Sequence, residues 1–392
     1  MADDVDKRVV KYLRTLVSIR SVSGEEGEVA HRIKEIMDAE GVDKAFIDEY
    51  GNVIGVVKGS IDKCIVYEGH MDHVPEGDLS NWETPPYKPK IINNRVYGRA
   101  TVDMKGAIAA MLTSISMIKP PHPTIYLVFV SQEEIAEGIL LKYTLENTLG
   151  IKPDLVVLGE ATNLNISIGQ RGRAVIHVRI RGETSHASMP EKGMNALAAS
   201  TFIMDRVLKL KNKLPSHRLL GRSTATPTII ECTPKSPPMV PDHCFINIDR
   251  RFIVGEDEDK ILSEIKFIAD KALEKNLAKD VKVSIPVEHL PLWNGRKLEA
   301  RHFFPAWITE RNHVVRGILR LIKNKVFSDS RFMTWRFSTD GVYSAGIAGI
   351  PTIGYGPGDE SLAHKPNENV PIKHLIKAVD GYSRIPEAYK RL

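Results

Sequence analysis

The stretch from Cys64 to Asp72, CIVYEGHMD, places an apolar run directly before two side chains that can serve a metal site. The run Cys64–Tyr67 is continuously apolar, as expected of a strand buried on both faces of a sheet. His70 and Asp72 therefore leave the carboxyl end of a core strand, the edge at which open α/β sheets bind ligands. The sequence predicts an α/β protein with its site at this edge.

Two more predicted strands end in acidic residues. The apolar run 124–130 is followed by Glu133 and Glu134, and the strand predicted over 154–158 is followed by Glu160. A helix predicted over 102–117 has Asp103 at its beginning, and His364 lies in a late turn-rich segment. This recurrence favours one shared site over chance clustering.

The pattern changes near Arg173, where apolar and polar residues begin to alternate as in a strand with one solvent-exposed face. The following segments predict a strand-helix-strand-strand-helix-strand order, the ferredoxin-like plan. These segments are 174–181, 195–210, 226–231, 244–250, 257–276 and 281–287. We therefore expect a catalytic domain over 1–172 and 293–392, with a lid or dimerisation domain inserted over 173–292.

The composition argues for a soluble globular protein. Hydrophobic residues make up 42% and charged residues 26% of the 392, and 54 Lys and Arg against 49 Asp and Glu give a net charge of +5. The basic residues alternate with acids, so we expect no nucleic-acid partner. The longest apolar-rich stretch, 107–118, is shorter than the ~20 residues of a membrane span. We therefore expect no membrane association.

The polar, acidic start of the chain predicts no signal peptide. The three cysteines, Cys64, Cys232 and Cys244, have no CxxC spacing, which argues against a disulfide framework and against a cysteine-type zinc site. We expect them to be small buried residues in a reducing compartment, and the protein to be cytoplasmic.

The candidate residues suit amide hydrolysis by two metal ions. Two divalent ions about 3.5–4 Å apart can activate a water and polarise a carbonyl. Zinc accepts imidazole and carboxylate ligands together, and the absence of cysteine ligands leaves Co²⁺ or Mn²⁺ possible. Asp72 could accept the second N–H of His70. Because Glu133 and Glu134 are adjacent, one could bind metal while the other acts as general base.

The ordered motifs resemble the acetylornithine deacetylase/succinyl-diaminopimelate desuccinylase/carboxypeptidase family of dinuclear zinc hydrolases over nearly the whole chain. The resemblance implies a zinc-peptidase-like α/β/α catalytic domain with an inserted ferredoxin-like α+β lid, and a homodimer formed through that lid. Five segments are closest to the family's YgeY-type hydrolase branch: 159–162 (GEAT), 169–173 (GQRGR), 249–251 (DRR), 337–341 (FSTDG) and 349–364.

The resemblance also implies a role for each candidate ligand. His70 and Glu160 would bind one zinc, Glu134 and His364 would bind the other, and Asp103 would bridge them. Glu133 would be the general acid and base, Asp72 would orient His70, and a cis peptide bond would follow Asp103. One departure is Ala100, which stands where the family commonly has glycine.

Residues of the inserted domain would complete the site. His186, in the segment TSHAS, would donate a hydrogen bond to the oxyanion, often from the partner subunit. Arg251 would bind a substrate carboxylate through its guanidinium fork, and the adjacent Arg250 is a competing candidate. We expect His73 to lie outside the metal site and Glu137 to be solvated.

We therefore expect a hydrolase that cleaves the amide bond of an N-acyl amino acid or a small dipeptide-like molecule. Three alternatives remain open. The first is release of an amino acid from an acidic carrier protein, the second is a metal-retaining homologue without catalysis, and the third is an aminopeptidase acting on longer peptides.

Overall fold

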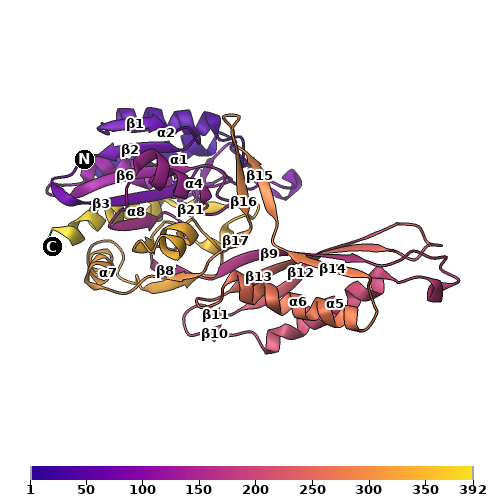
Figure 1. Ribbon diagram of the computed structural model, residues 1–392. Coiled ribbons are helices and arrows are strands. Elements are labelled where there is room, and N and C mark those ends of the chain that lie inside the picture. Colours follow the sequence, from indigo (N-terminus) through magenta and orange to yellow (C-terminus); the bar gives the residue numbers. More distant parts are fainter. Residues whose placement is uncertain (1, 391–392) are drawn as a thin grey trace.

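The computed structural model describes residues 2–390 and has a large mixed sheet at the centre of the catalytic part (Figure 1). Its nine strands follow the order β1-β2-β6-β3-β7-β20-β8-β18, with β19 beside β8. The central strands β3 (Ile61–His70), β6 (Pro123–Val130) and β7 (Leu155–Leu158) are parallel. The others are β1 (Lys44–Ile47), β2 (Val53–Val57), β8 (Ile166–Gln170), β18 (Trp307–Ile308), β19 (Phe332–Trp335) and β20 (Thr352–Gly354).

Alternate residues of the central strands pack into separate cores on the two faces of the sheet. In β3, Ile65 and Tyr67 face one core and Val66 faces the other. Both faces are covered, which is why these strands read as continuous apolar runs. The first face is covered by α1 (Ala2–Val17), α2 (Gly27–Ala39), α3 (Lys105–Ser114), α7 (His313–Lys325) and α8 (Ile372–Arg384), and the second by α4 (Ile139–Tyr143) and neighbouring turns.

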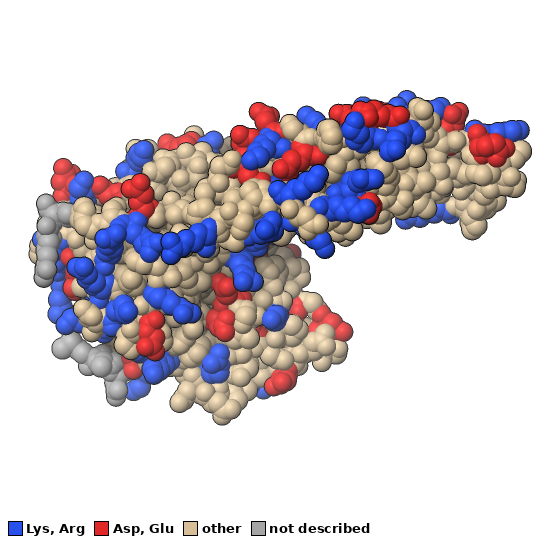
Figure 2. All heavy atoms as spheres, turned by 90° about the horizontal axis from the view of Figure 1, so that it is seen from below, with Lys and Arg blue, Asp and Glu red and all other residues tan. Residues whose placement is uncertain are grey.

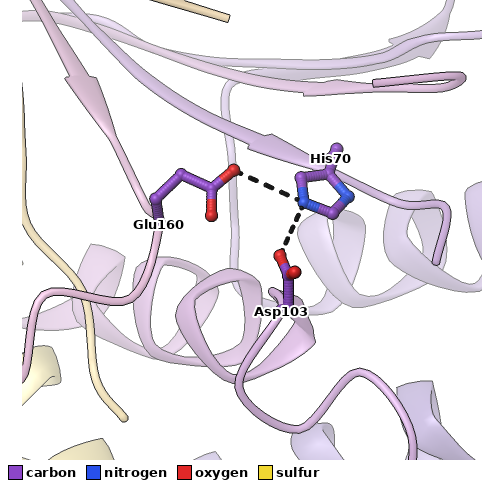
Figure 3. Close-up of side chains that lie close together, drawn as sticks. All are labelled: His70, Asp103 and Glu160. Carbon is purple, nitrogen blue, oxygen red and sulfur yellow. Dashed lines mark hydrogen bonds and ion pairs between the residues drawn. The ribbon is translucent and has the colours of Figure 1, made fainter. Parts of the chain in front are cut away.

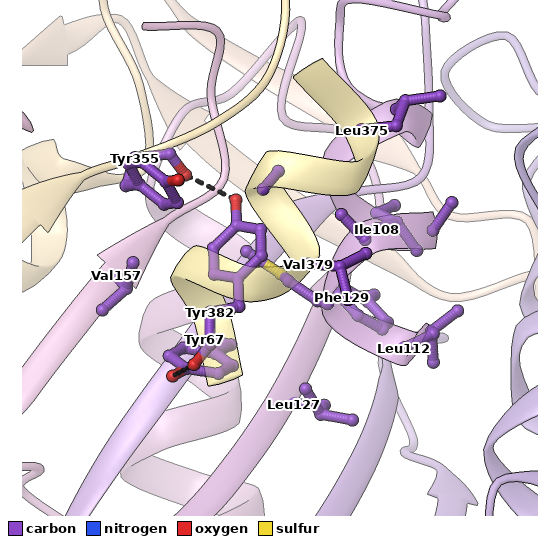
Figure 4. Packing of buried hydrophobic residues seen from close by; sticks show 14 of the residues in the cluster. Tyr67, Ile108, Leu112, Leu127, Phe129, Val157, Tyr355, Leu375, Val379 and Tyr382 are labelled. Carbon is purple, nitrogen blue, oxygen red and sulfur yellow. Dashed lines mark hydrogen bonds between the residues drawn. The ribbon is translucent and has the colours of Figure 1, made fainter. Parts of the chain in front are cut away.

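The helix α8 packs against the sheet through a set of buried tyrosines (Figure 4). The Tyr67 hydroxyl donates to the backbone carbonyl of Tyr382 at 2.6 Å, and the Tyr382 hydroxyl donates to the carbonyl of Tyr355. Each buried phenol therefore has a polar partner, as such groups require. The predicted α/β/α arrangement is confirmed.

A second sheet forms the inserted domain, with strand order β12-β13-β9-β14 and β17 beside β9. Every pairing in it is antiparallel, and two helices pack on one of its faces. Asn195 and Asp257 cap the two helices by accepting the first free backbone N–H groups. The elements are β9 (Gly172–Arg181), α5 (Ala196–Lys209), β12 (Thr224–Thr233), β13 (His243–Phe252), α6 (Glu258–Glu274), β14 (Asp280–Ser284) and β17 (Phe303–Phe304).

The order of these elements matches the predicted ferredoxin-like plan, and the domain extends from the catalytic part as a long arm (Figures 1 and 2). Smaller elements surround the two sheets. They are the hairpin β15 (Val287–Pro291) and β16 (Lys297–Arg301), the pair β10 (Ser216–His217) and β11 (Gly221–Arg222), and the small sheet of β4 (Lys90–Ile92), β5 (Arg95–Tyr97) and β21 (Asn369–Pro371).

The cysteine prediction is wrong for two of the three residues. Cys232 and Cys244 form a disulfide between β12 and β13, where they are direct cross-strand partners with Cα atoms 4.2 Å apart. Their spacing of 12 residues resembles no motif, because strand register rather than sequence distance brings them together. Cys64 is a free, half-buried thiol. The cysteines therefore do not support the prediction of a reducing compartment.

The surface carries both charge signs. Figure 2 shows Lys and Arg interspersed with Asp and Glu over the face that it presents. Among residues 2–390, no helix is both long and apolar enough to cross a membrane.

Gly356 marks a close approach of two backbones, and its substitution is a test of this packing. A Cβ atom at Gly356 would lie 2.2 Å from the Gly159 carbonyl oxygen, so we expect Gly356→Ala to lower the free energy of unfolding by about 2 kcal/mol or more. Gly317→Ala is the matched control in α7, where the new Cβ would meet only Ala388 at 4.0 Å. We expect that control to stabilise by about 0.5–1 kcal/mol in urea unfolding followed by circular dichroism. Equal stabilities for the two variants would contradict the close packing.

Candidate functional site

The predicted site residues meet at the carboxyl edge of the central sheet. β3 lies between β6 and β7, and all three run in the same direction. Their ends therefore bring together His70 from β3, Glu133 and Glu134 after β6, and Glu160 after β7. The remaining members, Asp103 and His364, come from the turn before α3 and from the loop before β21.

These side chains form two groups that share Asp103 (Figure 3 shows the first). In the first group, His70 Nε2 lies 3.0 Å from Asp103 Oδ1 and 3.5 Å from Glu160 Oε1. In the second group, His364 Nε2 lies 2.9 Å from Asp103 Oδ2 and 3.0 Å from Glu134 Oε1. Within each group the possible ligand atoms lie within 4.8 Å of one another, so each group could hold one metal ion.

The loop before α3 is shaped to present Asp103 to both groups. The Asp103–Met104 peptide bond is cis, as the resemblance implied. Ala100 has a φ of +65°, a left-handed conformation that glycine adopts most readily and that explains why glycine is common at this position. The buried Glu368 carboxylate accepts the backbone N–H groups of Ala100, Val102 and Asp103 at 2.7–3.1 Å.

Asp72 contacts His70 and also holds the Glu133–Glu134 turn. Its Oδ1 lies 3.5 Å from His70 Nδ1, which is closer, at 3.0 Å, to the backbone carbonyl of Asp72 itself. The Asp72 carboxylate accepts the backbone N–H of Glu133 at 3.1 Å and of Glu134 at 3.2 Å, and the Ser23 hydroxyl at 2.6 Å. Asp72 therefore positions both the imidazole and the glutamate doublet.

Glu133 presents a free carboxylate oxygen beside the two groups. Its Oε2 lies 3.9 Å from His70 Nε2, while its buried Oε1 has no hydrogen-bond partner within residues 2–390. Burial, together with the charges of Glu160 and Asp340, raises the pKa of Glu133 well above its usual range, although the nearby His70 opposes the shift. The Glu134 carboxylate points instead to His364, so the two neighbours have separate directions, as predicted.

The site has an excess of buried negative charge. Burial, and then the Asp103 charge, raises the pKa of Glu160 to about 7 and also raises that of Glu134. Hydrogen bonds to Asp103 and Glu134 raise the pKa of His364 to about 10. Four carboxylates, those of Asp103, Glu133, Glu134 and Glu160, share this edge with two imidazoles. A mixed carboxylate and imidazole set of this kind fits divalent cations, which supply positive charge.

A cavity of about 410 Å³ opens onto these residues and is shared by both domains. The catalytic domain contributes Glu133, Glu134 and His364, and the inserted domain contributes Arg173 and Arg251. Such a volume suits a small molecule.

Of the two adjacent arginines, only Arg251 reaches the cavity. The Arg251 guanidinium binds both oxygens of Asp249, at 2.8 and 3.2 Å. Arg250 points to the opposite face of β13, where it is fully buried and pairs with Glu256 at 2.5 Å and Glu264 at 3.1 Å. Its prediction as a substrate-binding residue is therefore wrong, because alternate residues of a strand face opposite sides of a sheet.

Glu137 is buried rather than solvated, which corrects another prediction. It lines the cavity and pairs with Arg173 across the two domains at 3.0 Å. His73 is buried outside both metal-binding groups, as expected, and its Nε2 accepts the backbone N–H of Ser21 at 3.0 Å.

His186 is exposed. It follows the end of β9 that is farther from the cavity of the same chain. β9 begins at Gly172 beside the catalytic domain and ends at Arg181, and ten residues of strand span about 30 Å. The His186 side chain forms a hydrogen bond within its own segment, with Nδ1 2.7 Å from the Ser188 hydroxyl. This chain alone does not bring His186 to the site.

Four buried residues that support the site were not predicted. Glu368 pairs with Arg99 at 3.0 Å, and Glu26 accepts the backbone N–H of Gln132 at 3.1 Å. Glu26 and Gln132 are 106 positions apart, so no local spacing could reveal this contact. The only available signal was the position of Glu368 four residues after His364, which by itself indicates no role.

Comparison with known proteins identifies the class. Residues 66–388 match Peptidase family M20/M25/M40, and the chain belongs to this family. It is therefore a metallohydrolase of a family of peptidases and deacylases that act on amide bonds.

Three relatives show how far the similarity extends. The uncharacterized protein YgeY of Escherichia coli (strain K12) is 34% identical over 390 residues, covering 98% of this chain and 95% of YgeY. The uncharacterized metallohydrolase MJ0457 of Methanocaldococcus jannaschii is 28% identical, covering 97% and 99% of the two chains. An acetylornithine deacetylase of Aliivibrio salmonicida is 32% identical over 231 residues, which are 56% of this chain and 60% of that protein.

A solved structure shares the complete architecture. The M20 family metallo-carboxypeptidase Sso-CP2 from Sulfolobus solfataricus superposes with a TM-score of 0.78 at 20% identity, covering 98% of this chain and 99% of that one. At this identity the likeness establishes the fold alone.

The buried Glu26 predicts a pH dependence of stability. Burial, and then the charge of Asp72, raises the pKa of Glu26 from 4.5 to about 8. The folded protein holds this proton more tightly than the unfolded chain does. The Glu26 contribution to stability is therefore complete below pH 4.5 and is lost as the pH rises through about 8.

Glu26→Gln mimics the protonated side chain and tests this dependence. We expect the variant to exceed the wild type in free energy of unfolding at pH 9, by on the order of 1 kcal/mol or more. The difference should shrink as the pH falls towards 5, in urea titrations across that range. A difference that stays constant with pH would contradict the assignment to Glu26.

Proposed function

We propose that this protein is a cytoplasmic dinuclear zinc hydrolase that cleaves the amide bond of an N-acyl amino acid or a small dipeptide-like substrate. The observation that carries this proposal is the pair of ligand groups sharing Asp103, with the free Glu133 carboxylate beside them. The family's action on amide bonds and the small cavity agree with it.

Five residues would hold the two ions. His70 and Glu160 would bind the first, Glu134 and His364 the second, and the two oxygens of Asp103 would bridge them. When bound, two divalent ions polarise a carbonyl and lower the pKa of a water molecule. Zinc suits this donor set, and Co²⁺ or Mn²⁺ could replace it because the set has no thiolate.

Glu133 would carry the proton of the reaction. Its carboxylate would take a proton from the attacking water as an oxygen–carbon bond forms at the acyl carbon. It would then give that proton to the leaving nitrogen as the carbon–nitrogen bond breaks, leaving a carboxylic acid and an amine. Transfer of the acid proton to the amine gives the final carboxylate and ammonium. The raised pKa of Glu133, caused by burial, suits this role because it makes the carboxylate a stronger base towards the water proton.

Arg251 would bind the carboxylate of the substrate. In this structure its fork pairs with the two oxygens of Asp249, and a substrate carboxylate would use the same two-point geometry in place of that salt bridge. Arg173, its cross-strand partner, lines the same cavity. An N-acyl amino acid or dipeptide carries its free carboxylate a few bonds from the scissile amide, which matches a cavity with the ligand groups at one wall and Arg251 at another.

A homodimer would bring His186 to the site of the other subunit. β12 is an edge strand of ten residues with exposed Ile229 and Ile230 near its middle. Its start lies beside the catalytic domain, since Thr224 pairs with Arg251, and its end lies at the far tip of the arm. Antiparallel pairing of two copies of β12 about its centre would set the tip of one arm beside the cavity of its partner.

The first test is metal content together with hydrolysis. We expect about two divalent ions per chain and chelator-sensitive cleavage within a panel of N-acetyl amino acids, N-succinyl amino acids and dipeptides. Glu133→Ala should keep both ions but lose more than about 10²-fold in turnover. Failure to bind metal after zinc is added back would contradict the proposal, and normal turnover by Glu133→Ala would remove the base assignment. Two ions without cleavage would point to an untested substrate such as an acidic carrier protein.

Subunit mixing tests the role of His186. Glu133→Ala and His186→Ala homodimers should each be nearly inactive. Random heterodimers contain one site with an intact Glu133 and with an intact His186 from the partner subunit, so mixing should restore about a quarter of wild-type activity. No restoration, or a fully active monomer in light scattering, would exclude this action between subunits.

A further inference from the structure

The hairpin β15–β16 connects the inserted domain to the catalytic domain. It follows β14 of the arm and stands beside the catalytic sheet near α2 (Figure 1). Its two strands pair antiparallel from Val287↔Arg301 to Pro291↔Lys297, which leaves Leu292–Arg296 as the tip. The hairpin is paired with neither of the large sheets.

The tip of the hairpin is seated on the catalytic domain by Trp293. Its Nε1 donates to the Gly51 carbonyl at 3.0 Å, and its ring packs against the edge of His31. A Cβ atom at Gly51 would lie 2.4 Å from this indole and one at Gly27 would lie 2.8 Å from it. The neighbouring Asn294 donates to the Glu49 carbonyl at 2.9 Å. The absence of side chains at the two glycines therefore makes the space that the indole occupies.

The base of the tip contacts the turn that carries the glutamate doublet. The Gln132 side-chain amide donates to the Pro291 carbonyl at 2.8 Å. The Gln132 backbone N–H binds Glu26, and its carbonyl accepts the backbone N–H of Ala136 at 3.0 Å. Gln132 is buried and has a φ of +59°, so its contacts hold a left-handed residue immediately before Glu133.

Apolar packing extends the same contact. Leu290 of β15 and Ala300 of β16 form a small buried cluster with Ala136, which follows the doublet in the same turn. The turn 131–137 is thus held on one side by the Asp72 and Glu26 carboxylates of the catalytic domain. On the other side it is held by the hairpin that connects the inserted domain to the catalytic domain.

We propose that the hairpin 287–301 is a clasp that couples the placement of the inserted domain to the glutamate doublet, with Gln132 as the positioning residue. The inference rests on the proposed catalytic role of Glu133, because only that role makes the position of the turn matter for the reaction. Gln132 acts through Glu133 and contacts no ligand group. Loss of its hydrogen bond removes the polar part of the contact between the hairpin and the turn and leaves the apolar packing of Ala136.

Hydrogen exchange in the zinc-loaded protein tests the coupling without a substrate. Gln132→Met keeps the length of the side chain but removes the amide N–H donor. Trp293→Ala removes the indole that packs the tip of the hairpin against the catalytic domain. For both variants we expect the amides of residues 131–137 to exchange about tenfold faster, the size of effect expected for one buried hydrogen bond. Glu299→Ala is the matched control, since Glu299 is exposed on the same hairpin and lies 3.7 Å from His289. It should exchange as the wild type does.

Kinetics on the substrate found in the panel then test positioning. Gln132→Met should lower kcat severalfold with little change in KM, because the cavity walls that bind substrate remain. If the amides of residues 131–137 exchange at the wild-type rate in Gln132→Met, the proposal of a clasp is wrong. This conclusion holds even if Trp293→Ala folds poorly. Faster exchange with unchanged kcat would overturn the positioning role. If the wild type cleaves nothing while exchange responds as expected, the proposed function fails and the clasp remains.

Discussion

The structure depends on the cost of burying several carboxylates at one edge of a parallel sheet. Asp103, Glu133, Glu134 and Glu160 lie around two imidazoles, and burial raises the pKa of three of these four acids. An isolated buried carboxylate is expensive, so this edge needs fixed donors and cations. The donors in this structure are the imidazoles of His70 and His364, and divalent ions are the cations that fit the ligand set.

A second layer of acids holds the loops that carry the first. Asp72 accepts the N–H groups of the glutamate doublet, Glu26 accepts that of Gln132, and Glu368 accepts those of the Asp103 loop. Each of these buried side chains accepts backbone N–H groups, and these hydrogen bonds help to hold the loop that carries a site residue.

The other side of the site belongs to the inserted domain. Arg173 and Arg251 enter the cavity from β9 and β13, and Arg173 pairs with Glu137 across the domain boundary. The hairpin and Trp293 make a separate connection some distance from the cavity. The inserted domain and the hairpin thus supply two arginines of the cavity wall and a set of contacts to the glutamate turn.

The sequence by itself determined the α/β/α core, the ferredoxin-like order of the arm and the set of residues gathered at the sheet edge. It could do so because buried parallel strands are continuous apolar runs and because the residues that follow them necessarily meet at one edge. Only the tertiary structure showed which of Arg250 and Arg251 reaches the cavity and that Glu137 is buried. It also showed that Cys232 pairs with Cys244 and that Gln132 contacts the hairpin. Those outcomes depend on which face a residue occupies and which strand lies opposite it, and neither register nor domain placement is encoded in local spacing.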